Sequence, residues 1–283
     1  MKFYIVDCFA QAKYQGNQLA VFVPDRPITG MEMQQIANEM GFSETSFILS
    51  EKQPNGGYDV RIFTPAVEVS FAGHPTLGTA HVIQKCFEHD SAQEIRLNLK
   101  AGQIPVRINE NGLTMSQNQP DFGMTIEKAA VAAALFITPG DIRDDYPVQW
   151  ASTGLESVIV PLKTVEALER CHVDHDRLHA FHQTYCKCNV LAFVPQATEL
   201  RVRVFMDDPG FLEDPATGSA NGDLAAYLLH HQFFNSAEVS YSVSQGSEMG
   251  RPSTLLVSAS LVDGVYTIQV GGQAHIVATG DWE

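Results

Sequence analysis

The sequence predicts an α+β fold made of two related halves, each a strand-rich unit that encloses one helix of small and apolar residues. Short apolar runs predict strands in both halves, and two alanine- and leucine-rich stretches, 75–88 and 217–231, predict the buried helices. Residues 74–80 (HPTLGTA) also match residues 214–220 (DPATGSA) at an offset of 140 in a chain of 283. This repeat predicts internal pseudo-twofold symmetry.

The individual elements follow the same order in each half. An amphipathic helix is expected at 31–40, ended by Gly41, and short surface helices at 164–170 and 174–182. Strands are expected in the first half at 3–9, 19–23, 45–49, 59–63, 95–99 and 104–108. In the second half they are expected at 157–161, 190–195, 200–205, 239–243, 254–259, 265–270 and 274–278.

Turn residues followed by a helix start mark 118–130 as the boundary between the halves. We therefore expect a first lobe over 1–122 and a second lobe over 123–283. The last strands, at about 264–283, are candidates to pack back on the first lobe.

Composition limits the classes of partner. A formal net charge of −15 argues against binding to nucleic acid or to an anionic membrane surface. The N-terminal stretch lacks the apolar core of a signal peptide, and no window approaches the roughly 20 apolar residues of a membrane span. Five cysteines without CxxC spacing predict reduced thiols in a cytoplasmic protein.

The repeated motif is also the main candidate for a functional site. Pro75 and Pro215 fit the first position of a helix, which would place His74 and Asp214 at or next to the N-caps. A helix N-terminus attracts carboxylates. Glycines at positions 73, 78 and 218 would let a ligand approach the backbone, although each stretch alone is more often structural, with capping and close packing as its only roles.

Two further residues carry candidate chemistry. Glu44, in GFSETSF, lies between a helix end and a strand, where partial burial would suit it to general acid/base work, although such a residue is more often a surface turn glutamate. Ser219 follows Gly218 at a helix start and is interpreted as a donor to a substrate carboxylate.

Residues 171–188 form a competing cluster with four histidines and three cysteines. A transition-metal site there is chemically possible. The segment lacks the glutamate of H-E-x-x-H, however, and its CxC pair does not match the usual zinc spacing. A polar helix face is the simpler interpretation.

Five motifs in order, GNQLAVF, SETSFI, RIFTPAVEVSFAGHPTLGTA, EDPATGSANG and QGSEMGRPS, resemble the PhzF-like isomerases of phenazine biosynthesis, which have the diaminopimelate epimerase fold. The resemblance covers residue 1 to about 280. It implies two lobes, each a β-barrel-like sheet around a central helix, with the active site between them. It also implies a homodimer that needs no metal and no organic cofactor.

The same resemblance assigns roles to residues. Glu44 matches the acid/base carboxylate of the family, and His74 and Asp214 match its flanking polar pair. Residues matched to binding of a small-molecule carboxylate substrate are Ser43, Gly73, Gly218 and Ser219.

Laid over the epimerase motif, Ala72 stands where the first catalytic thiol belongs, and none of the five cysteines falls at either thiol position. A single-carboxylate proton shuttle, which moves a double bond in a small amino or cyclic diene carboxylic acid, is therefore favoured. The alternatives are a metabolite-binding member without physiological catalysis and a racemase or epimerase activity.

The sequence departs from the family at Gln18 and Asp207, where proline is common. Asp207 and Asp208 add negative charge near the expected site, which suggests a substrate with an amino or cationic group.

Overall fold

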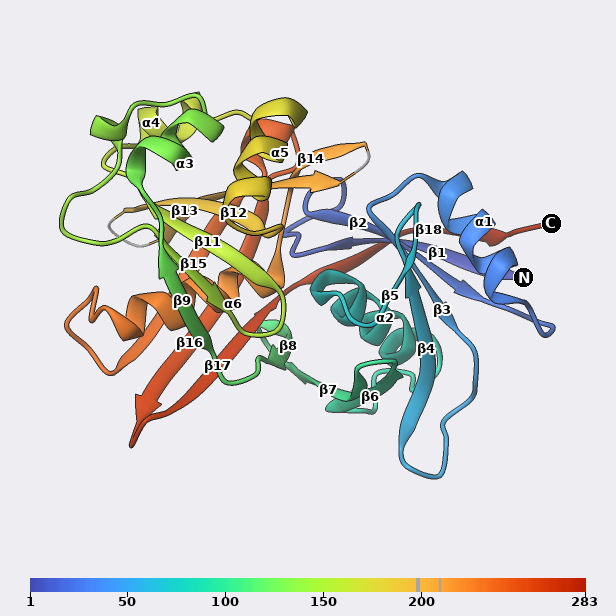
Figure 1. Ribbon diagram of the computed structural model, residues 1–283. Helices are drawn as coiled ribbons and strands as arrows, with labels where there is room; N and C mark the ends of the chain where they lie inside the picture. The colour runs from blue at the N-terminus through green and yellow to red at the C-terminus, as the bar shows by residue number, and fades with distance from the viewer. Residues whose placement is uncertain (197–198, 209) are drawn as a thin grey trace. The chain divides into compact units, whose positions relative to one another are not determined.

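The structure, a computed structural model, describes residues 1–196, 199–208 and 210–283, without the side chain of Asp208. The chain forms two compact units. Unit 1 contains Met1–Ser116 and Gly271–Glu283, and unit 2 contains Gln117–Val270. Figure 1 shows that each unit holds a helix, α2 or α6, packed against its own strands.

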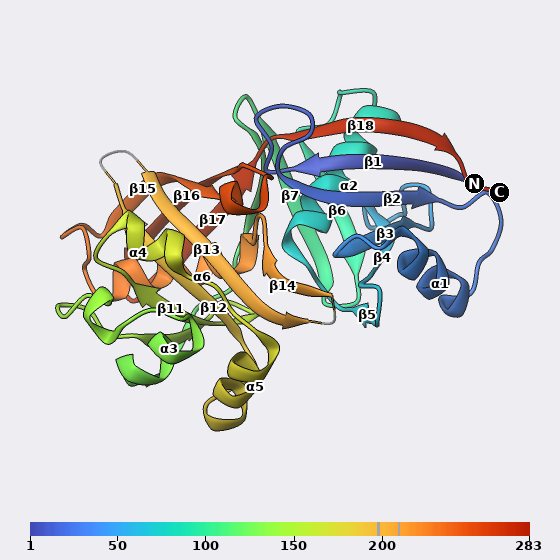
Figure 2. The same cartoon turned by 90° about the horizontal axis from the view of Figure 1, so that it is seen from above.

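The sheet of unit 1 is a continuous hydrogen-bonded series in which two neighbouring pairs, β2–β3 and β4–β6, are parallel and the others for which a register is given are antiparallel. Figure 2 shows β18, the last strand of the chain, beside β1. In order, the strands are β18 (Ala274–Asp281), β1 (Lys2–Cys8), β2 (Asn17–Val23), β3 (Glu44–Ile48), β4 (Gly57–Phe63), β6 (Glu94–Leu99), β7 (Gly102–Asn109) and β8 (Gly112–Ser116).

Helix α2 (Gly73–Cys86) is the central helix of unit 1 and contacts strands from β1 and β2 round to β8 and β18. Helix α1 (Gly30–Met40) begins after Thr29, whose side chain accepts a hydrogen bond from Glu32 N, and ends at Gly41 with φ 65°. The short strand β5 (Glu68–Val69) pairs with β4. An apolar cluster joins α1 to the sheet of unit 1 and contains Ala20, Phe22, Met33, Ile36, Ala37, Phe47 and Phe63.

Unit 2 repeats this pattern around α6 (Gly218–His230), which contacts β10, β11, β12, β15 and β16. Here the parallel pairs are β11–β12 and β13–β15. Its strands are β9 (Asp121–Thr125), β10 (Gln149–Ser152), β11 (Glu156–Pro161), β12 (Asn189–Pro195), β13 (Glu199–Asp208), β15 (Glu238–Gln245), β16 (Ser253–Val262) and most of β17 (Val265–Gly272), whose last two residues belong to unit 1. The short strand β14 (Phe211–Asp214) pairs with β13.

Three more helices of unit 2 cover a separate apolar cluster that includes Val131, Leu168 and Phe181. They are α3 (Lys128–Ala134), α4 (Val165–Arg170) and α5 (His175–Thr184). Two 3₁₀ turns, Pro139–Asp141 and Ser247–Met249, complete the unit. No helix in the described part of the chain is long and apolar enough to span a membrane.

The internal repeat extends to individual ion pairs. In unit 1 the guanidinium of Arg61 on β4 donates two hydrogen bonds, both 2.8 Å long, to Glu68 on β5. In unit 2 Arg203 on β13 donates two, of 2.8 and 2.7 Å, to Glu213 on β14. The matched strand order, parallel pairs and ion pairs confirm the predicted α+β repeat.

The predicted strands and helices are confirmed, with small shifts at their ends, but two details of the sequence analysis were wrong. Residues 121–125, expected to be a turn, form β9. The helix starts also differ from the prediction. Helix α2 begins at Gly73, so Pro75 is its third residue, while α6 begins only at Gly218, three residues after Pro215.

Candidate active site

In unit 1 the structure brings Glu44 and His74 together. Glu44 is the first residue of β3, and His74 is the second residue of α2. Glu44 Oε2 lies 3.4 Å from His74 Nε2, and the two side chains are 19% and 5% exposed. The candidate acid/base carboxylate is therefore largely withdrawn from water and next to an imidazole, an arrangement that can hold and transfer a proton.

Two neighbours complete this group. The Nδ2 atom of Asn17 lies 3.1 Å from His74 Nδ1, and Asn17 Oδ1 accepts a hydrogen bond of 3.4 Å from the Ser43 hydroxyl. Asn17 is only 2% exposed. Ser43 was expected to bind substrate, whereas Asn17 was missed by the sequence analysis although it belongs to the GNQLAVF motif.

The Gly16-Asn17 turn explains how this asparagine reaches the site. Gly16 has φ 71°, and a Cβ there would lie 2.2 Å from Cys8 O and 2.9 Å from Ala10 Cβ. Only glycine fits this left-handed turn between β1 and β2. Asn17 then pairs with Cys8 as the first residue of β2, which fixes its side chain inside unit 1.

Gly78 has a packing role that differs from the one expected. A Cβ at this position would lie 2.5 Å from Cys8 Sγ and 2.6 Å from Leu19 Cδ2. The glycine therefore lets α2 approach β1 and β2 closely, and the interpretation of Gly78 as a ligand approach point was wrong. Burial raises the pKa of the Cys8 thiol, with the charges of Asp7 and Glu44 adding to the effect. Cys8 is thus a core residue and not a catalytic base.

In unit 2 Asp214 is the last residue of β14, not a helix cap. The N-cap of α6 is Thr217, whose hydroxyl donates a hydrogen bond of 2.5 Å to Asp214 Oδ2. The amide of Gln245 donates to Asp214 O at 2.8 Å and to Thr217 Oγ1 at 3.1 Å, and its oxygen accepts from Asn221 at 3.0 Å. This Gln245 clamp holds the segment between β14 and α6.

Gly218 and Ser219 are the first two residues of α6 and are buried. Their backbone N–H groups have no acceptor within the helix, as in every first helical turn, so the position suits a carboxylate. The segment before them is packed tightly, because a Cβ at Gly246 would lie 2.5 Å from Pro215 O. Gly246, at φ 78°, belongs to the QGSEMGRPS motif.

The predicted site residues thus fall into two groups. Ser43, Glu44, Gly73 and His74 gather in unit 1, where α2 meets the start of β3. Asp214, Gly218 and Ser219 gather in unit 2 at the start of α6.

Three histidines of the segment 171–188 lie beside the carboxylate of Asp207, whereas the sequence analysis considered a transition metal as their partner. His175 Nδ1 lies 2.9 Å from Asp207 Oδ1, and the Nδ1 atoms of His179 and His182 each lie 3.8 Å from Asp207 Oδ2. The hydrogen bond from His175 holds the pKa of Asp207 below its usual range. In the ranges that the structure describes, no group of three or more histidine, cysteine or acidic side chains is arranged to hold a metal ion.

This pairing bears on specificity. The carboxylate of Asp207 stays ionised beside three histidines of α5, so a cationic substrate group would have to share it with them. The hypothesis that the substrate carries an amino or cationic group stays a prediction. The side chain of Asp208, named in the same hypothesis, lies outside the described residues.

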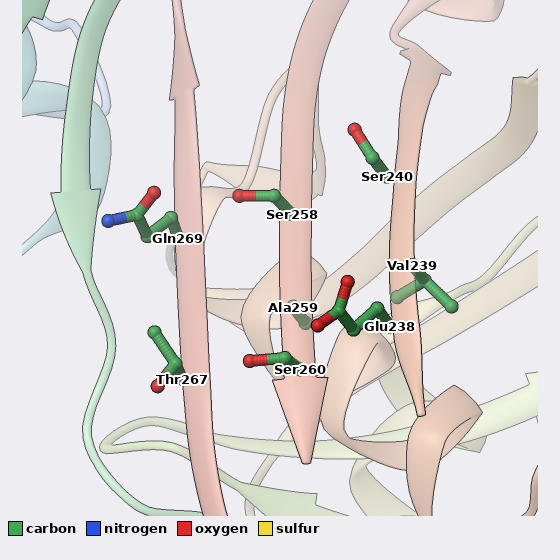
Figure 3. A pocket seen from close by; sticks show the side chains of 8 residues that line it. All are labelled: Glu238, Val239, Ser240, Ser258, Ala259, Ser260, Thr267 and Gln269. Atoms are coloured by element: carbon green, nitrogen blue, oxygen red, sulfur yellow. The ribbon is translucent and has the colours of Figure 1, made fainter. Parts of the chain in front are cut away.

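A pocket of about 530 Å³ lies on β15, β16 and β17 (Figure 3). Small hydroxyl side chains make up half of its lining, among them Ser240, Ser258 and Thr267, with Glu238 as its one carboxylate. It contains none of the predicted site residues. An open patch of serine and threonine offers neither a proton-transfer pair nor a helix N-terminus, so we do not assign the activity to it.

A sheet that encloses a central helix, repeated in both units, defines a class of protein, the two-lobed proteins of diaminopimelate epimerase fold. The carboxylate–imidazole pair lies beside the first such helix. Solved structures agree. A PhzF-family protein of Bacillus anthracis matches with a TM-score of 0.90 and 26% identity, covering 99% of this chain and 98% of that one. A hydroxyproline epimerase of Agrobacterium vitis, 11% identical, shares the fold with a TM-score of 0.65, covering 99% and 91% of the two chains.

The sequence comparisons identify the family. Residues 6–280 match the PhzC-PhzF family, described as phenazine biosynthesis-like protein. The trans-2,3-dihydro-3-hydroxyanthranilate isomerase of Pseudomonas aeruginosa is 32% identical over 281 residues, covering 99% of this chain and 98% of that protein. The chain belongs to the PhzC-PhzF family and is an isomerase, which confirms the resemblance.

Proposed function

We propose that the protein moves a proton from one carbon to another on a small unsaturated carboxylic acid, with Glu44 as the acid/base group. The observation that carries this proposal is the 3.4 Å approach of Glu44 Oε2 to His74 Nε2 in a largely buried setting. A relative that shares 32% of its sequence is a trans-2,3-dihydro-3-hydroxyanthranilate isomerase. That compound, a cyclic diene amino acid, is therefore the first substrate to test.

The proposed reaction needs one carboxylate. Glu44 removes a proton from a carbon next to the conjugated system, the electron pair shifts along it, and the protonated Glu44 returns a proton to a second carbon. His74 and Asp214 would act as the flanking polar pair. Substrate-carboxylate contacts would come from Ser43 and Gly73 in unit 1 and from Gly218 and Ser219 in unit 2.

Two features favour a carboxylate over a thiol as the base. Ala72, the N-cap of α2, stands where the epimerase branch has a thiol. Cys8, whose thiol is close enough to feel the charge of Glu44, is buried and has a raised pKa. Racemisation by opposed thiols would need groups that these positions do not supply.

The test is solvent-proton exchange. The protein is incubated in deuterium oxide with trans-2,3-dihydro-3-hydroxyanthranilate and with a panel of unsaturated and amino carboxylic acids, and deuterium uptake is followed by mass spectrometry. We expect uptake into an unsaturated acid. Replacing Glu44 with glutamine should slow it by at least about 100-fold, because a positioned acid/base group contributes about two to four orders of magnitude.

Glu39→Gln is the matched control, since it removes the same charge from an exposed position on α1 and should leave uptake unchanged. Uptake that survives Glu44→Gln would contradict the role of Glu44. Exchange confined to the α-hydrogen of saturated amino acids would instead favour a racemase. Binding of acids without uptake across the panel would favour a metabolite-binding protein.

We also propose, from the family resemblance, that the protein is a homodimer. Light scattering coupled to size-exclusion chromatography should give about twice the 31.1 kDa mass of the chain. A mass of one chain across the accessible concentrations would contradict this.

A further inference from the structure

The contact between Asn17 and His74 determines which ring nitrogen of the histidine carries the proton. Its amide carries one end that only donates and one end that only accepts. The donating Nδ2 lies 3.1 Å from His74 Nδ1, and the accepting Oδ1 receives the Ser43 hydroxyl at 3.4 Å. With the amide in this orientation, His74 Nδ1 must be the acceptor.

The consequence falls on the other ring nitrogen. A neutral imidazole has one N–H, and a hydrogen bond at one nitrogen decides which nitrogen carries it. If Nδ1 accepts from Asn17, the proton is on Nε2, which lies 3.4 Å from Glu44 Oε2. The Ser43 hydroxyl then donates to Asn17, Asn17 donates to His74, and the remaining N–H of His74 faces Glu44.

We infer that Asn17 is a positioning residue that holds His74 in its Nε2–H tautomer, so that the N–H of the imidazole faces Glu44 and stabilises it electrostatically as the carboxylate that accepts the substrate proton. The series starts at Ser43 and ends at Glu44, which are neighbours in the chain, so the start of β3 sets both ends. The catalytic consequence rests on the proposed function, but the tautomer itself does not.

The orientation of the amide is the point on which the inference depends. A flipped amide would present Oδ1 to the ring and would require the proton on Nδ1, which would leave the Nε2 lone pair facing the Glu44 carboxylate. Ser43 opposes the flip, because its hydroxyl donates to Oδ1. Asn17 is 2% exposed, so bulk water does not compete for either end.

The tautomer can be measured without any substrate. In ¹⁵N-labelled protein, long-range proton–nitrogen correlation spectra distinguish protonated from unprotonated ring nitrogens, and the His74 signals are those that disappear in His74→Gln. At a pH above the titration of the ring, we expect Nδ1 unprotonated and Nε2 protonated. A proton on Nδ1 would overturn the inference.

Asn17→Asp is the sharpest variant, since it keeps the shape but replaces the donor with an acceptor. We expect the proton to move to Nδ1 and the exchange rate to fall by about 10- to 100-fold, by analogy with the partners that orient metal-binding histidines. An unchanged tautomer in this variant would contradict the positioning role. So would an unchanged rate with the tautomer moved.

Ser43→Ala provides a second route if Asn17→Asp does not fold, and it should give a mixture of tautomers, while Ser43→Thr should keep the Nε2–H form. A single Nε2–H tautomer in Ser43→Ala would contradict the orienting role of the hydroxyl. The matched control is Ser46→Ala. It removes another buried hydroxyl from β3, which bonds Thr79 on α2 at 2.6 Å, and should leave the His74 spectrum unchanged.

The two proposals fail in different ways. If Glu44→Gln still catalyses exchange, the proposed function fails, whatever the tautomer of His74. If Glu44→Gln is inactive but His74 carries its proton on Nδ1, the proposed function stands and the role of Asn17 fails.

Discussion

Helices α2 and α6 begin in segments of matching sequence, 74–80 and 214–220, but they begin at different positions of that motif. Helix α2 begins at Gly73, whereas α6 begins at Gly218, which matches Gly78 at the offset of 140. His74 therefore projects from within a helical turn, while Asp214 ends a strand. The partner of each segment explains the difference, because the Gln245 clamp holds residues 214–217 out of the helix. The repeated motif predicts that a helix follows it, but tertiary contacts such as those of Gln245 determine the residue at which the helix begins.

The largest expected effect concerns the interior of the two helices. Asp223 in α6 matches Ile83 in α2 at the same offset, and both are fully buried. Asp223 accepts hydrogen bonds from Thr153 N at 2.6 Å, Thr153 Oγ1 at 2.8 Å and Ser157 Oγ at 2.6 Å. Burial outweighs these donors and raises its pKa from 3.8 to about 7.

A carboxyl with a raised pKa favours the folded state when protonated. Its contribution is therefore complete below about pH 4 and is lost as the pH rises toward 7. The free energy of unfolding should fall over this interval by up to about 4 kcal/mol more in the wild type than in Asp223→Asn. Urea unfolding at several pH values measures the difference. Parallel curves for the two proteins would show that Asp223 does not titrate in this interval.

The next effect tests the clamp that delays the start of α6. Gln245→Ala should lower the free energy of unfolding by about 3 kcal/mol, because it leaves buried partners at Asp214, Thr217 and Asn221 without their hydrogen bonds. Urea unfolding measures the loss. Gln269→Ala, on the open face of β17, is the control and should cost less than about 0.5 kcal/mol.

The comparison with α2 sharpens this prediction. In α2 the nearest equivalent is a single bond of 2.7 Å from Thr76 Oγ1 to Ala72 O within the helix itself. Thr76→Val should therefore cost only about 1 kcal/mol. Equal losses in Gln245→Ala and Thr76→Val would mean that the clamp contributes no more than one local hydrogen bond.

The smallest effect tests the close approach of α2 to β1 and β2. Gly78→Ala gains about 1 kcal/mol of helix propensity but forces a Cβ to 2.5 Å from Cys8 Sγ, and overpacking of this kind costs about 1–3 kcal/mol. We expect a net loss of stability of about 1 kcal/mol. In a double-mutant cycle with Cys8→Ala the loss should shrink. Additive losses would show that the thiol is not the obstacle.

Much of this architecture could be predicted from the sequence, because short apolar runs and the motif repeated at an offset of 140 identify the strands, the central helices and the two candidate site segments. Gly41 predicted the end of α1, and the five motifs predicted the family. The features that the sequence could not predict depend on tertiary contacts. Strand β9 is short and mostly exposed, so it has no apolar signature. The burial of Asp223 and the late start of α6 depend on partners from the turn after β10, from β11 and from β15.

The candidate site shows the same limit. Glu44 and His74 were proposed from their motifs, but Asn17 looks in sequence like an ordinary turn residue after glycine. The signal that could have identified it is the Gly16-Asn17 pair itself, since a glycine forced to positive φ fixes the direction of the next side chain. Gly78 was misinterpreted because close helix packing and close approach of a ligand both require a residue without a side chain, so the sequence does not distinguish them.

The pairing of β18 with β1 has a consequence for the order of folding during synthesis. Unit 2 is one uninterrupted stretch of chain, whereas the sheet of unit 1 needs residues 271–283 beside the first strand, with Met1 N bonded to Trp282 O at 2.9 Å. As the chain leaves the ribosome, β1 must wait with an unpaired edge until these residues emerge. The sheet of unit 1 therefore closes only after residues 271–283 have been made, whereas unit 2 comes from one continuous stretch of chain.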